Sequence, residues 1–303
     1  MTETSGASGR PFAGQAAMLL CAVCWSTGGL FIKLVDWHPL VIAGGRSLLA
    51  ALFLYALRIG GHAKTGAAGR RHSLPMLIFG SVNYALTMIL FVVANKLTTS
   101  ANAILLQYTA PVWAALLGWF FLNEPPRAEH WGALAMVGVG MVLFFKNSLG
   151  SGALGGDILA LISGVSFGAN AVILRKAKDQ NPADILLGAN VVVALASLPF
   201  FVMFPPVLNL RNCAGICVLG FVQIGAASAL FAWGIQRVTV IQAMLITMLE
   251  PVLNPVWVLL VTGERPSAAV IVGGGIILCA VILSSIISAR RGKVAQKISM
   301  ASP

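Results

Sequence analysis

Residues 102–126, NAILLQYTAPVWAALLGWFFLNEPP, have a counterpart 140 positions further along the chain, residues 242–266, QAMLITMLEPVLNPVWVLLVTGERP. Each stretch is an apolar run long enough for a helix, with a proline near its middle and a Glu-X-Pro sequence at its end. Pro111 therefore matches Pro251. A repeated unit of this kind indicates an internally duplicated fold, which has to be recognised before other features are interpreted.

The repeat extends to the helices around these stretches. Asn83 matches Gln223 at the same offset of 140, and Trp25 matches Phe167 at an offset of 142. Because the correspondence recurs over several helix pairs, it covers both halves of the chain and is more than a short shared motif.

The composition places the duplicated unit in a membrane. Of the 303 residues, 58% are hydrophobic and 10% are charged, and the mean hydropathy is +0.89. Soluble domains have about a quarter of their residues charged, so this chain has too little polar surface for a water-soluble globule. The basic residues behind the net charge of +11 fall mainly in short loops between apolar runs. Membrane topology explains that pattern, and we expect no nucleic-acid partner.

A spanning helix needs about 20 apolar residues. We expect ten of them, at residues 12–35, 39–57, 75–95, 99–122, 130–145, 155–174, 182–204, 211–234, 239–262 and 267–288. The sequence thus predicts an all-α integral membrane protein with ten transmembrane helices, arranged as two inverted five-helix repeats. The predicted parts are a cytoplasmic N-terminal tail at 1–11, the first repeat at 12–147, the second repeat at 148–288 and a basic cytoplasmic C-terminal tail at 289–303.

Because each repeat has an odd number of helices, the second must enter the membrane upside down relative to the first. The loops agree, since 14 Lys and Arg residues fall on one side of the membrane and 5 on the other. An excess of Lys and Arg marks the cytoplasmic side, which places both termini in the cytoplasm. Inverted repeats with a site near the membrane midplane are the architecture of secondary transporters, which work by alternating access.

The chain resembles the drug/metabolite transporter superfamily and, within it, the ten-helix EamA-type exporters. The resemblance rests on residues 111–124, on Leu249-Glu250-Pro251 and Gly263-Glu264, and on Arg46 and Trp25-Ser26. It implies a bacterial inner-membrane exporter of small metabolites, most similar to exporters of amino acids, including aromatic ones. It also implies a central cavity lined by helices 1, 3, 4, 6, 8 and 9.

Polar and aromatic residues on these six helices are the candidate substrate-binding residues, namely Trp25, Asn83, Tyr84, Gln107, Tyr108, Trp113, Ser166, Asn170, Gln223, Phe231 and Thr247. Pro111, Pro251 and Pro255 are expected to kink helices 4 and 9, because a proline removes a helical hydrogen bond. Backbone groups freed at this depth need a partner or a water-lined cavity. The alternative is that the kinks are static and that neighbouring helices satisfy the freed backbone groups. The symmetric placement of Pro111 and Pro251 favours kinks that border the substrate cavity and bend during transport.

Arg46 and Glu250 are the charged residues predicted to lie deepest in the membrane. Such residues are costly to bury and usually functional. Two roles are open at this point. Glu250 can tune transport, for example by carrying a proton, or the two residues can form a structural ion pair.

Other functions fit less well. No histidine is predicted within the membrane and the chain has no H-E-x-x-H or G-x-S-x-G motif, so we expect no catalytic residues, metal or cofactor, and no enzyme. The expected partners are a small-molecule substrate and membrane lipid, with the oligomeric state open. A multidrug or cation exporter of the same superfamily is the alternative, although helix 1 lacks an acidic residue, and a channel is the third reading.

Overall fold

The computed structural model describes residues 10–60, 73–98, 100–145, 154–179, 181–262 and 267–301. These residues form helices and their connections, without a β-strand among them. Five of the predicted membrane segments are single helices, α3 (Pro39–Ile59), α4 (Leu74–Leu97), α7 (Ala128–Phe145), α8 (Leu154–Lys176) and α15 (Ala268–Ala301).

The other five predicted segments are each divided. They are α1 (Arg10–Ser26) with α2 (Gly28–Leu34); α5 (Ser100–Gln107) with α6 (Ala110–Leu122); α9 (Pro182–Ala196) with α10 (Leu198–Met203); α11 (Leu210–Cys217) with the π-helix η1 (Val218–Ala226) and α12 (Ala227–Ile235); and α13 (Val240–Thr247) with α14 (Leu249–Thr262). In the described residues, eight stretches are long and apolar enough to cross a membrane, and shorter apolar helices at Ala128–Leu143 and Val240–Leu253 supply the fifth and ninth segments. The predicted all-α, ten-segment fold is confirmed.

Two of the three expected proline kinks are present. The fourth segment is interrupted between Gln107 and Ala110, just before Pro111, and the ninth is interrupted between Thr247 and Leu249, just before Pro251. The third expected kink stays a prediction, because α14 continues through position 255 and the side chain of Pro255 lies outside the described part of the chain.

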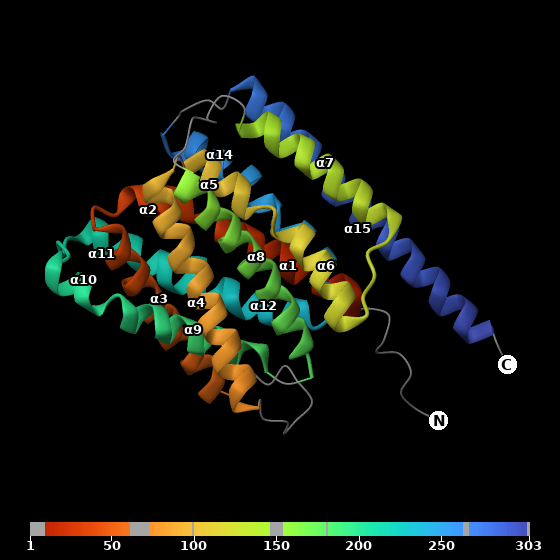
Figure 1. Cartoon of the computed structure of the whole chain (residues 1–303), viewed down its shortest axis with the longest axis horizontal. Helices are drawn as coiled ribbons and strands as arrows, with labels where there is room; N and C mark the ends of the chain where they lie inside the picture. The colour runs from red at the N-terminus through yellow and green to blue at the C-terminus, as the bar shows by residue number, and fades with distance from the viewer. Residues whose placement is uncertain are drawn as a thin grey trace.

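The last helix is longer than predicted. The sequence places the boundary between helix and tail after residue 288, but α15 continues to Ala301 and projects past the rest of the bundle (Figure 1). The added residues include Ala, Arg, Lys and Gln, which are strong helix formers, so their charge ends the apolar span without ending the helix.

The first helix of each repeat packs among helices of the other repeat. One set, which we call the first bundle, consists of α4, α5–α6 and α8, because α8 packs along α4, α5 and α6. The equivalent set, the second bundle, consists of α1, η1–α12 and α13–α14, since α1 packs against all of these. The halves of the chain are therefore interlocked.

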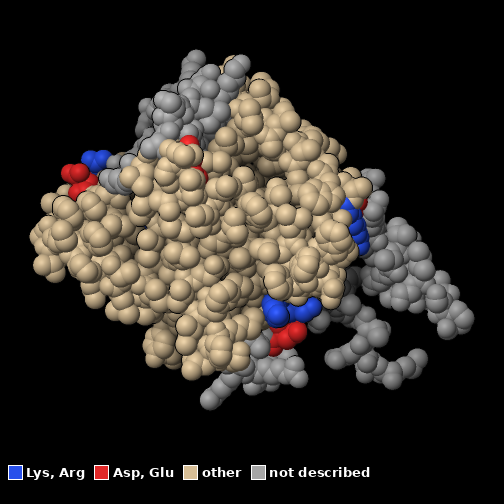
Figure 2. All heavy atoms as spheres, in the orientation of Figure 1, with Lys and Arg blue, Asp and Glu red and all other residues tan. Residues whose placement is uncertain are grey.

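The remaining helices surround these two bundles. α3 packs against α9 and η1, and α9 also packs against α4, so this pair closes one side of the molecule. α7 and α15 lie side by side along the opposite edge (Figure 1). The broad middle of the face in Figure 2 carries no charged atoms, and the charged groups drawn there lie toward its periphery. An uncharged middle suits contact with lipid.

Candidate functional site

The two predicted deep charges lie near each other but are not paired. Arg46 on α3 donates from Nη1 to Gln223 Oε1 at 3.4 Å. The Glu250 carboxylate lies beside the Tyr108 hydroxyl and is close enough to Arg46 to interact electrostatically. None of the ion pairs within 4.0 Å between described residues joins Arg46 to Glu250. The open question from the sequence is thereby answered in part: they are neighbours without a direct salt bridge.

The helix breaks bring Glu250 and Tyr108 together. Glu250 lies in the first turn of α14, directly after the break at Met248. A carboxylate there lies beside backbone N–H groups that have no partner within the helix, and the helix dipole favours negative charge. Tyr108 lies in the symmetry-related break between α5 and α6. The two interrupted helices thus meet at this point, and discontinuous helices are typical of substrate sites in transporters.

Two further groups belong to this central cluster. Tyr84 on α4 is buried, and it lies close enough to Arg46, Glu250 and Cys21 to interact with them electrostatically. Arg46 keeps unused hydrogen-bonding capacity, because its Nε is buried and has no hydrogen-bond partner among the described residues. We call Arg46, Tyr84, Tyr108, Gln223 and Glu250 the central polar cluster.

An aromatic group lies between the bundles on the side of α1. The Trp25 ring lies 5.4 Å from the Phe231 ring and 6.1 Å from the Phe167 ring, measured between centroids. Trp25 and Phe231 are both buried in the largest hydrophobic core, which Tyr84 also joins. These rings therefore form an apolar wall within the same core as part of the central polar cluster.

Three of the predicted binding residues, Asn83, Ser166 and Asn170, form hydrogen bonds to each other. Asn83 Nδ2 donates to Asn170 Oδ1 at 2.6 Å, and Asn170 Nδ2 donates to Thr87 Oγ1 at 2.8 Å. Ser166 Oγ donates to Asn83 O and Asn83 Oδ1, both at 3.0 Å. These contacts join α4 to α8 in the first bundle, and the side chains form a satisfied polar network.

Gln107 extends this network, since its Nε2 donates to Ser163 Oγ at 2.9 Å and Ser163 Oγ in turn donates to Thr87 O at 3.0 Å. Glycines let the helices approach this closely. A Cβ on Gly168 would lie 2.7 Å from Ala110 O, and a Cβ on Gly164 would lie 2.9 Å from Leu106 O. Small residues at helix contacts are typical of membrane bundles.

The polar network gives a prediction about stability. Asn170→Ala removes one hydrogen-bond partner of Asn83 Nδ2 and one of Thr87 Oγ1, although both atoms keep a contact to Ser166. We expect the free energy of unfolding to fall by about 1–3 kcal/mol. Thermal unfolding in detergent measures this loss. Ser73→Ala is the control, because Ser73 is exposed and its side chain makes no capping hydrogen bond to α4. Equal stability of the two variants would contradict the network's role.

Two other predicted binding residues bond locally. Trp113 Nε1 donates to Thr109 Oγ1 at 3.1 Å, one turn back along the fourth segment. Thr247 Oγ1 donates to Met244 O at 2.8 Å and is buried. Their roles toward a substrate stay predictions.

A second polar cluster closes one end of the structure, where α6 and α8 both end. Arg175 Nε donates to Glu124 Oε1 at 2.9 Å, and Arg175 Nη1 donates to the carbonyls of Ile235 at 3.1 Å and Gln236 at 2.7 Å. Glu124 Oε2 accepts from the Val240 amide at 3.1 Å. We call the Glu124–Arg175 pair with these backbone partners the clasp.

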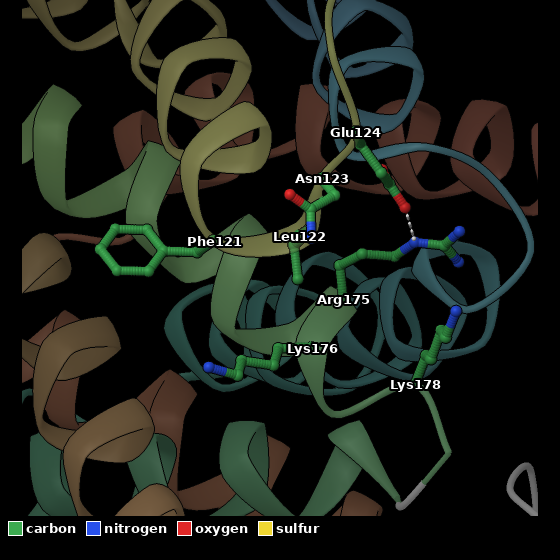
Figure 3. A pocket seen from close by; sticks show the side chains of 7 residues that line it. All are labelled: Phe121, Leu122, Asn123, Glu124, Arg175, Lys176 and Lys178. Atoms are coloured by element: carbon green, nitrogen blue, oxygen red, sulfur yellow. Dashed lines mark hydrogen bonds and ion pairs between the residues drawn. The ribbon is translucent and has the colours of Figure 1, made fainter.

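The clasp joins the two bundles. Glu124 and Arg175 belong to the first bundle, and the backbone groups they bind lie at the turn between α12 and α13 in the second. Asn123, with φ of 53°, ends α6 in the left-handed conformation and turns the chain to Glu124. Glu124 and Arg175 also line a cavity of about 220 Å³, whose other lining residues are Phe121, Leu122, Asn123, Lys176 and Lys178 (Figure 3).

Sequence reasoning missed the clasp and one other contact. Trp257 Nε1 donates to Ser26 Oγ at 2.7 Å and so ties α14 to α1. The signal for the clasp was present in the repeated Glu-X-Pro sequence, but nothing in the sequence paired Glu124 with Arg175, which is 51 positions away. No group of three metal-ligating side chains gathers in the described residues.

Interlocked inverted repeats, paired helix breaks and a polar cluster within an apolar core define a polytopic membrane transporter. The model of the EamA-like transporter family matches twice, over residues 12–146 and 154–286. The chain belongs to the EamA-like transporter family, and the resemblance to EamA-type drug/metabolite transporters is confirmed.

Similar proteins are also transporters by name. An uncharacterized transporter of Archaeoglobus fulgidus is 27% identical over 274 residues, which cover 89% of this chain and 96% of that protein. The uncharacterized transporter YwfM of Bacillus subtilis is 25% identical over 296 residues, covering 93% and 97%. Human solute carrier family 35 member G1 is 30% identical over 181 residues, covering 55% of this chain and 48% of that protein. A solved crystal structure with 19% identity has a TM-score of 0.79 over 92% of this chain and 98% of that one, which shows the fold.

Proposed function

We propose that this protein exports small zwitterionic metabolites, most favourably amino acids with apolar or aromatic side chains, across a bacterial inner membrane by alternating access. The observation that supports this substrate class is the separation of Arg46 from Glu250 within the central polar cluster. A positive and a negative group lie near each other without a salt bridge between them. A zwitterion has the complementary pair of charges.

The energetics favour such a ligand. A charge within the membrane is costly to hold without a partner. The carboxylate of an amino acid can accept from the unoccupied N–H groups of Arg46, and its ammonium group can donate to Glu250. Charge-assisted hydrogen bonds of this type are stronger than neutral ones. The nearby rings of Trp25, Phe167 and Phe231 offer an apolar contact for the side chain.

The clasp supports the alternating-access part of the proposal. It lies at the end that the loop charges assign to the cytoplasm, and it holds the first and second bundles together there. A bundle-to-bundle contact at one end has to break when that end opens. The structure therefore corresponds, in this proposal, to a state closed toward the cytoplasm.

The test of the proposed function is a flux measurement in proteoliposomes. We expect saturable, exchange-stimulated uptake of radiolabelled phenylalanine, leucine or a related neutral amino acid. Cationic dyes and the corresponding amines should not compete, because the positive charge of Arg46 repels a cation that has no carboxylate. Competition by cationic dyes without competition by any zwitterion would instead support a cation exporter, and non-saturable flux would support a channel.

The predicted orientation gives a separate expectation. A reporter enzyme that is active only outside the cytoplasm, fused after Pro303, should be inactive, because the charge distribution places the C-terminus inside. The same reporter inserted in the loop after α4, on the predicted outer side, should be active. An active C-terminal fusion would contradict the predicted orientation and would put the clasp on the outer side of the membrane.

A further inference from the structure

Asn83 and Gln223 occupy equivalent positions in the two repeats, but their side-chain amides have different hydrogen-bond partners. In the first bundle, Asn83 is bonded to Asn170 and Ser166 on α8. The repeat places Gln223 of η1 at the position of Asn83. At the offset of 142 that aligns the first helices, Asn170 corresponds to Gly28. The position equivalent to Asn170, the partner of Asn83, therefore has no side chain.

Gly28 leaves the space that Gln223 occupies. A Cβ at position 28 would lie 2.9 Å from Gln223 Nε2 and 3.3 Å from its Cδ. Gln223 is buried, yet its Oε1 extends to Arg46 Nη1 on α3. In the first bundle the Asn83 amide joins α4 to α8. In the second bundle the equivalent Gln223 amide contacts Arg46, the positively charged member of the central polar cluster.

The local backbone supports this arrangement. Gln223 lies within the π-helix η1, which packs along α3. The two helices are close beside Arg46, since a Cβ on Gly220 would lie 3.2 Å from Arg46 O. π-helical turns within longer helices are rare and frequently occur at functional sites. Here the π-helix carries Gln223.

We infer that Gln223 is a positioning residue, which holds the Arg46 guanidinium so that its remaining N–H groups face the substrate carboxylate, and that Gly28 is required for this. The inference rests on the proposed function for the identity of the substrate. Gln223 Oε1 occupies one N–H of Nη1. A guanidinium has five N–H donors in a fixed plane, so fixing one of them fixes the direction of the others, including the unpartnered Nε–H.

The experiment compares Gly28→Ala, Gln223→Leu and their combination in the transport assay. Gly28→Ala adds one methyl group that displaces the flexible end of Gln223. Each single variant should raise the KM for a neutral amino acid about tenfold and change the maximal rate less than about twofold, as expected for loss of an oriented charged hydrogen bond. The combined variant should match the single ones, because both act through one contact. Gly138→Ala is the matched control, since a Cβ there meets nothing within 4 Å.

A second readout needs no substrate. Modification of Arg46 by an arginine-specific dicarbonyl, followed at the peptide level by mass spectrometry, should be faster in Gly28→Ala and Gln223→Leu than in the wild type and Gly138→Ala. Unchanged modification rates in both variants would overturn the inference. So would additive effects on KM, or a fall in maximal rate with KM unchanged, because these would show that Gly28 acts independently of Gln223. A wild type that carries no zwitterion but shows the expected modification rates would overturn the proposed substrate and leave the positioning of Arg46 supported.

Discussion

Replacing Arg46 with glutamine is expected to lower the transport efficiency for neutral amino acids by about a hundredfold. In the proposed site Arg46 binds the substrate carboxylate, and a hydrogen bond to a charged group contributes about 1.5–3 kcal/mol, where each 1.4 kcal/mol corresponds to a tenfold change. Arg46→Lys keeps the charge but loses the planar set of donors, so it should retain intermediate activity. The measurement is initial uptake rate against substrate concentration in proteoliposomes.

Glu250→Gln is the companion variant, and the two should differ in which substrates they affect. Loss of Glu250 should weaken recognition of the ammonium group and so affect N-acylated compounds less than amino acids. Loss of Arg46 should remove the repulsion that keeps amines without a carboxylate from competing. A fall in the amount of folded protein would obscure both results, because removing one charge leaves the other without a counter-charge. Thermal unfolding of each variant, and of Arg46→Gln combined with Glu250→Gln, separates stability from recognition. Identical substrate profiles in the two single variants would contradict a zwitterion site.

Breaking the clasp is expected to shift the protein toward the state that is open at the Arg175 end. Arg175→Ala removes the ion pair to Glu124 at 2.9 Å and the bonds to the carbonyls of Ile235 at 3.1 Å and Gln236 at 2.7 Å. We expect the ratio of open to closed protein to rise at least tenfold, which corresponds to about 1.4 kcal/mol. Spin labels at Phe12 on α1 and at Lys178 after α8, both exposed, report the separation of the bundles as a distance distribution in a cysteine-free background.

Arg58→Gln is the matched control for the clasp. Arg58 pairs with Asp184 at 3.1 Å, but its side chain is 54% exposed, and exposed ion pairs contribute little. This pair joins α3 to α9 and does not bridge the two bundles. An equal shift in Arg58→Gln and Arg175→Ala would show that loss of any ion pair, and not of the clasp, moves the equilibrium.

Much of the fold follows from the sequence because the length of apolar runs and the chemistry of proline act locally. The ten segments and the breaks before Pro111 and Pro251 depend on residues within one helix, and they were predicted. A kink at Pro255 follows from the same chemistry and stays a prediction, because α14 is continuous through that position. The continuation of α15 past residue 288 was missed because apolar length marks where a span ends, not where its backbone hydrogen bonding ends.

The site was only partly predictable, because it depends on how helices are rotated against each other. Asn83 and Gln223 occupy equivalent positions in the repeat, yet one faces a bonding partner and the other faces Arg46. The difference is made by Asn170 and Gly28 on neighbouring helices, and the sequence alone does not show that these helices touch. The distance between Arg46 and Glu250 likewise depends on packing of helices more than 200 residues apart.

The exchange of first helices between the repeats also has a consequence for how the protein is made. α4 presents Asn83 and Thr87 to α8, which follows it by more than 50 residues in the chain and therefore leaves the ribosome later. In lipid, unpartnered polar groups are costly, so α4 is incompletely satisfied until α8 has been inserted beside it. α1 must likewise wait for α12, α13 and α14. We therefore expect assembly of this transporter to be completed late in translation, and we do not expect either repeat to fold alone.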